Sequence, residues 1–62
     1  MTNEKIAHDL SLLVLSDSSE RDSVFLAIEE QQKVNSDDSQ TKKYVVAYDF
    51  LVHNFLVELN QK

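Results

Sequence analysis

Two carboxylate–histidine pairs are the residues of this sequence whose types and spacing best fit a chemical role. Asp49 precedes His53 by four positions, and Glu4 precedes His8 by the same interval. On a helix this spacing places both side chains of a pair on one face, where they could bind a metal ion or act as acid and base. A zinc site needs at least three protein ligands, however, and no further histidine is within local reach. We therefore interpret both pairs as solvent-facing and predict no metal site, although a dimer that joined the His8 or His53 pairs of two copies could create one.

Other catalytic groups are poorly represented. The chain has no cysteine, hence no thiol nucleophile or disulfide, and no glycine, hence no glycine-rich phosphate loop. Most serines cluster in two polar breaks, where helix capping explains them. We interpret Tyr44 and Tyr48 as core aromatics with their hydroxyls at the rim. The sequence thus predicts no catalytic residue, no cofactor, no small-molecule substrate and no enzymatic activity.

The length of the chain makes association with another protein the default expectation. Sixty-two residues form one domain, residues 1–62, and so short a chain buries only about 60% of its unfolded surface. Small domains usually compensate with disulfides, metals or partners. Since 42% of the residues are hydrophobic, the composition fits a folded domain rather than a disordered chain.

The net charge of −5 disfavours direct attraction to nucleic acid or to an anionic membrane. Lys42 and Lys43 could contact phosphates at the start of a helix, but Asp37 and Asp38 precede them. The acidic residues, concentrated in residues 1–40, leave one alternative open: a nucleic-acid-related regulator that acts by acidic mimicry or by direct DNA contact. No secretory leader or membrane-spanning segment is expected, so we predict a cytoplasmic protein without membrane contact.

Helical periodicity predicts an all-α fold of three helices over residues 3–15, 19–34 and 37–60, arranged as an up-down-up antiparallel bundle. Thr2 or Asn3 is expected to cap the first helix. Either Asp17 with Glu20 or Ser19 with Asp22 has the spacing of a capping box for the second. We expect Asn35 to end the second helix in the left-handed conformation, and Ser36, Asp38 or Ser39 to cap the third.

Each helix has an apolar face that should point inward. The first contributes Ile6, Ala7, Leu10, Leu13 and Val14; the second contributes Val24, Phe25, Ala27, Ile28 and Gln31, with Val34 near its edge; and the third contributes Tyr44, Val45, Tyr48, Leu51, Val52, Phe55, Leu56 and Leu59.

A second, narrower apolar line runs along the third helix through Val46, Phe50 and Val57. In a monomeric bundle these three residues would face water. Scattered surface apolar residues are common, but a line of them on the longest helix of a small domain favours a contact with another chain. We predict a homodimer, or a complex with another protein partner, that uses this line together with the apolar end of the first helix; its interface residues are Val46, Phe50, Val57, Leu12, Leu15 and Leu26.

The two ends of the chain resemble short, uncharacterised, phage- or prophage-associated helical proteins of Gram-positive bacteria. The resemblance lies in Ala7-His8-Asp9-Leu10, which matches an A-H-[DE]-L helix, and in Tyr44, Tyr48 and Leu51, which match a Y-x3-Y-x2-[LF] helix. It implies a small helical accessory protein of the cytoplasm and carries over no functional residue. With the apolar line above, it leads us to expect a non-enzymatic interaction module, with a phage-type regulator or inhibitor as one possibility.

Overall fold

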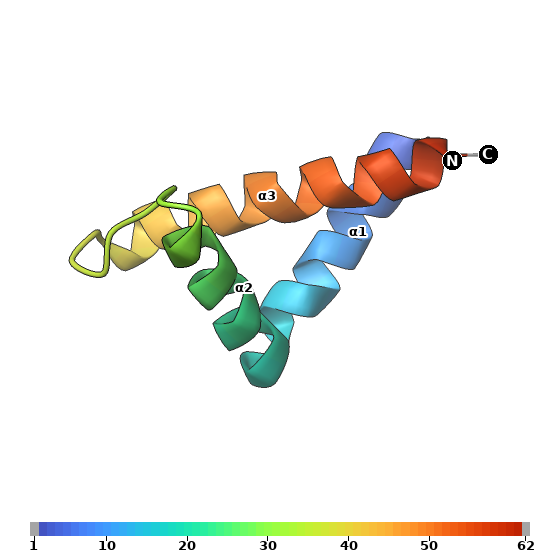
Figure 1. The fold of residues 1–62 in the computed structure, drawn as a ribbon. Coiled ribbons are helices and arrows are strands. Elements are labelled where there is room, and N and C mark those ends of the chain that lie inside the picture. The colour runs from blue at the N-terminus through green and yellow to red at the C-terminus, as the bar shows by residue number, and fades with distance from the viewer. Residues whose placement is uncertain (1, 62) are drawn as a thin grey trace.

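The computed structural model describes residues 2–61, which form three α-helices. They are α1 (Asn3–Ser16), α2 (Ser18–Glu30) and α3 (Gln40–Asn60). In Figure 1, α3 runs along one side of a triangle, α1 crosses its C-terminal half and α2 returns to its N-terminal half. All three helices pack against one another, so the predicted all-α three-helix bundle is confirmed.

A polar side chain caps the start of each helix. The backbone N–H of Lys5 donates to Thr2 Oγ1 (3.1 Å), that of Glu20 to Asp17 Oδ1 (3.0 Å), and that of Lys42 to Ser39 Oγ (3.1 Å). All three caps are among those the sequence offered. The third helix begins at residue 40 instead of 37, because Ser39 is the cap and the residues before it belong to the loop.

The end of α2 differs from the prediction that this helix continues to residue 34 and that Asn35 ends it. Gln32 adopts φ 61°. Its N–H donates to the Glu29 carbonyl (3.0 Å), and the N–H of Lys33 donates to the Ile28 carbonyl (2.9 Å). These are the two bonds of a Schellman motif, so Gln32 occupies the left-handed position that glycine usually fills. The earlier turn directs Val34 back into the core, where it is buried.

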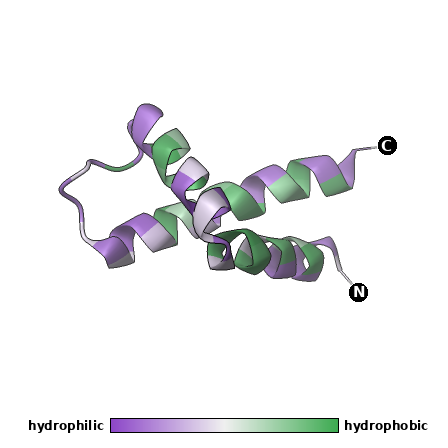
Figure 2. Ribbon diagram, turned by 90° about the horizontal axis from the view of Figure 1, so that it is seen from below, coloured by the Kyte–Doolittle hydropathy of each residue, from purple (hydrophilic) through white to green (hydrophobic). Residues whose placement is uncertain are grey.

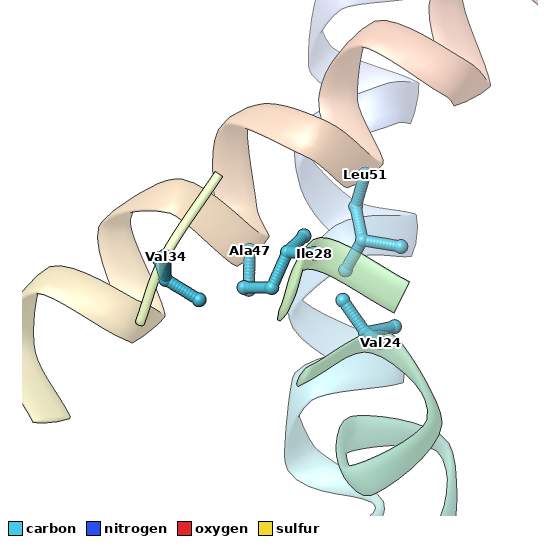
Figure 3. Close-up of a cluster of buried hydrophobic side chains, with 5 residues drawn as sticks. All are labelled: Val24, Ile28, Val34, Ala47 and Leu51. Atoms are coloured by element: carbon cyan, nitrogen blue, oxygen red, sulfur yellow. The ribbon is translucent and has the colours of Figure 1, made fainter. Parts of the chain in front are cut away.

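The core lies where α2 and the segment after it meet the middle of α3. It consists of Val24, Ile28, Val34, Ala47 and Leu51 (Figure 3). Only Ile28 among the large hydrophobic side chains of residues 2–61 is completely buried. Ala47, which the sequence did not place in the core, is also completely buried; its small side chain lets α2 approach α3 closely.

Four residues expected to point inward are exposed instead. Leu13 is 66% exposed, Val45 is 56% exposed and Tyr44 is 40% exposed. Gln31, which follows the last residue of α2, is exposed as well. For Tyr44 and Val45 the reason is that α1 and α2 approach α3 from different directions along its length (Figure 1). The buried face of α3 therefore turns around the helix axis from one half of the helix to the other. The sequence prediction assumed that one face of α3 is buried along its whole length.

Small residues and polar links join α1 to α3. On α1, Ala7 and Ser11 are completely buried, and the Ser11 hydroxyl donates to the Ala7 carbonyl (2.7 Å). At the ends of the two helices, Asn3 Nδ2 donates to Asn60 Oδ1 (2.6 Å).

Candidate functional site

A surface groove of about 360 Å³ lies along α3. Val46, Asp49, Phe50 and His53 line it from the helix, and Lys33 lines it from the segment that follows α2. The four α3 residues share one face because they recur at helical spacing. Lys33 joins them only because the chain turns at Gln32, which is why the sequence did not reveal it as part of this site.

The floor of the groove is apolar and its rim is charged. Val46 and Phe50 are half-buried and pack against the core cluster, so the expectation that they face water in a monomer is wrong: the segment after α2 covers part of them. Asp49 and His53 are exposed at the rim. The groove thus combines an apolar floor with the negative carboxylate of Asp49 and the positive ammonium of Lys33.

The apolar line of α3 continues past the groove to Val57, which is 46% exposed. Val46, Phe50, His53 and Val57 follow one another at intervals of four, three and four residues. This is the alternation of the a and d positions of a heptad repeat, the pattern by which a helix packs along another helix. We call these four residues the α3 seam. His53 is its one polar residue.

The remaining predicted interface residues lie away from the groove lining. Leu12 and Leu26 are exposed on α1 and α2, at 49% and 61%, while Leu15 is half-buried against the core cluster. Hydrophobic colour predominates over the C-terminal half of α1 in Figure 2, and this half also carries the exposed Leu13. The structure therefore does not gather the six residues on one surface, and a contact role for each of them stays a prediction.

His8 does not face solvent as a partner of Glu4; this expectation is wrong. Its Nδ1 lies 2.7 Å from the Tyr48 hydroxyl, in a hydrogen bond that is partly buried. The two rings meet edge to face, with centroids 5.7 Å apart and planes at 75°. Forty positions separate the two residues, so no local pattern could have shown this pair. It joins α1 to α3 and gives His8 a structural role.

The loop before α3 engages both lysines that were considered as phosphate contacts. Lys42 Nζ lies 3.3 Å from Asp38 Oδ2, and Lys43 Nζ donates to the Ser36 carbonyl (2.9 Å). The backbone N–H of Asn35 donates to Asp38 Oδ2 (2.8 Å). This hydrogen bond, followed by the Lys42 ammonium, outweighs partial desolvation and lowers the pKa of Asp38. The acidic loop thus holds the two cations at the start of α3.

Within residues 2–61, no three side chains of the metal-ligating types lie close enough to hold an ion. Asp49 and His53 supply two candidate ligands at one rim of the groove. Neither of them forms an ion pair or a side-chain hydrogen bond with another described residue. They are therefore available to a partner that approaches the groove.

Comparison of the chain with protein-family models, with curated proteins and with solved structures returns no match. The likeness to phage-associated proteins therefore stays a prediction. In the part of the chain that the structure describes, none of the helices has both the length and the apolar character that crossing a bilayer requires.

Proposed function

We propose that this protein is a non-enzymatic interaction module of the cytoplasm that associates through α3, with a second copy of itself as its partner. The observation that carries the proposal is the groove on α3, because it lies on the α3 seam. A groove with an apolar floor and a charged rim, continued by an exposed valine, is the surface that a partner helix would cover.

The intervals of four, three and four residues read the same in both directions, so the seam can pair with the seam of a second copy. If two α3 helices lie antiparallel with Val46 opposite the partner's Val57, then Phe50 lies opposite the partner's His53. The same two contacts recur on the other side of the two-fold axis. Such an arrangement is isologous, and in antiparallel coiled coils a and d positions face each other as they do here.

The size of the folded chain supports association as well. Its core contains few fully buried side chains, and large apolar residues remain exposed on all three helices. A small domain without disulfides gains stability when a partner covers such surface.

A substitution at Val57 tests this proposal, because this side chain contributes to the seam without belonging to the core cluster. Val57→Lys places a charge in the seam, whereas Val45→Lys introduces the same charge on another face of α3. We expect sedimentation velocity at micromolar concentration to show a dimer for the wild type and for Val45→Lys, and a shift towards monomer for Val57→Lys. A monomeric wild type would contradict the proposal. So would a Val57→Lys protein that dimerises as well as Val45→Lys.

A regulatory or inhibitory role in a phage-type setting is a further part of the proposal and rests on the resemblance of the chain ends. The alternative of a nucleic-acid-related regulator gains no support from the lysines of α3, since loop oxygens engage both. A salt-sensitive shift of labelled DNA would favour direct contact, and displacement of DNA from a basic partner would favour acidic mimicry.

A further inference from the structure

We propose that two copies joined through α3 share one zinc-binding site, to which each copy contributes Asp49 and His53. The inference rests on the proposed self-association, because one chain supplies too few ligands. Both residues stand on the rim of the groove and are exposed. Their spacing of four positions places both side chains on the same face of α3.

The register of the seam determines where the partner's residues lie. With Val46 opposite the partner's Val57, the two-fold axis passes between Leu51 and Val52. The partner's His53 is then level with Phe50, only about 1.5 Å along the helix axis from Asp49. The two His53 residues are offset by about 4.5 Å along the axis, and the two Asp49 residues by about 7.5 Å.

His53 belongs to the seam but lies on the side of it that carries Asp49, so all four side chains can meet along one edge of the helix pair. A two-fold axis perpendicular to the plane of two antiparallel helices brings like edges together, so the Asp49–His53 edge of one copy adjoins that of its partner. The sequence along this shared edge is Asp49, the partner's His53, His53, and the partner's Asp49. Each carboxylate thus lies beside an imidazole of the other chain.

Two imidazole nitrogens and two carboxylate oxygens form a ligand set that suits Zn²⁺. This ion takes four ligands in tetrahedral geometry and accepts both donor types, whereas Mg²⁺ prefers oxygen ligands in an octahedron. The two carboxylates balance the charge of the ion. Zinc would also reduce the repulsion between two chains that each carry a net charge of −5.

The second carboxylate–histidine pair of the chain provides a matched control. Glu4 and His8 have the same spacing, but His8 is bonded to Tyr48 and the pair lies outside the α3 seam. A substitution at Glu4 should therefore leave zinc binding unchanged, although it removes a carboxylate that precedes a histidine by four positions, as Asp49 does.

Isothermal titration calorimetry and sedimentation velocity on metal-free protein test the inference. We expect one Zn²⁺ per two chains. With free zinc at about 100 times its dissociation constant, the dimer dissociation constant should fall about 100-fold. Mg²⁺ at the same concentration should have no effect. His53→Gln and Asp49→Asn should abolish or strongly weaken the zinc effect, with circular dichroism showing that both variants fold, while Glu4→Gln should respond to zinc as the wild type does.

The remaining outcomes separate the two proposals. A dimer whose dissociation constant does not change with zinc overturns the zinc site and leaves self-association intact. A monomer both with and without zinc overturns both proposals. Zinc bound at one ion per chain, or bound unchanged in the folded His53→Gln variant, overturns the shared site.

Discussion

His8 and Tyr48 connect α1 to α3 through a hydrogen bond of 2.7 Å between Nδ1 and the phenolic oxygen. Together with the hydrogen bond from Asn3 to Asn60 at the ends of the two helices, this bond helps to set the relative position of α1 and α3.

Removing the Tyr48 hydroxyl should lower the free energy of unfolding by the contribution of one partly buried hydrogen bond. We expect Tyr48→Phe to lower the free energy of unfolding by about 1 kcal/mol, because the ring packing is kept while His8 loses its partner. Urea unfolding followed by circular dichroism measures the change. Tyr44→Phe is the control, since no side-chain hydrogen bond joins the Tyr44 hydroxyl to the described residues; an equal loss in both variants would contradict a specific role for the pair.

The completely buried Ile28 should be the most sensitive position of the core. Ile28→Val removes one methylene group and should lower the free energy of unfolding by about 1 kcal/mol. Ile28→Ala should cost about 2–5 kcal/mol, enough to unfold a domain of this size. Thermal unfolding of these variants beside Leu26→Ala, which truncates an exposed residue of the same helix, checks the prediction. A larger effect at Leu26 than at Ile28 would contradict the core described above.

Gln32 offers a stabilising substitution. A non-glycine residue in the left-handed conformation costs about 1–2 kcal/mol relative to the right-handed one, and glycine avoids most of this cost. We expect Gln32→Gly to raise the free energy of unfolding by about 0.5–1 kcal/mol after the greater flexibility of the unfolded chain is counted. Gln31→Gly is the control, because Gln31 has a negative φ of −82° and should gain nothing. A lower midpoint of urea unfolding for Gln32→Gly would refute the prediction.

Acid should weaken the loop before α3 through Asp38. The Asn35 N–H and then Lys42 lower the pKa of this carboxyl in the folded chain below its unfolded value near 3.8. A lowered pKa means that the stabilising contribution is complete above the unfolded pKa and is lost as the pH falls through the folded pKa. Asp38→Asn should therefore reduce the decline of stability below about pH 4, while Asp37→Asn, at the exposed neighbouring position, should change it less. Unfolding curves at a series of acidic pH values provide the measurement, and identical pH profiles for wild type and Asp38→Asn would rule out this contribution.

Local sequence determined which elements form, and it offered a short set of candidate caps for the start of each helix. The caps at Thr2, Asp17 and Ser39 depend on short side chains that reach backbone N–H groups within the same turn, so their spacing could be recognised without the fold. Helical periodicity likewise identified Val24, Ile28 and Leu51 as core residues. It also placed Val46 and Phe50 on one line and Asp49 beside His53, which are four of the five residues that line the groove.

Only the tertiary structure decided what surrounds these residues. The angle at which α1 and α2 meet α3 leaves Val45 exposed and buries Ala47, because the covered face of α3 turns along its length. The left-handed Gln32 brings Lys33 to the groove, and no sequence signal marks a glutamine for that conformation. The pairing of His8 with Tyr48 joins residues from opposite ends of the chain, and such distant contacts arise from the packing of whole helices rather than from local spacing.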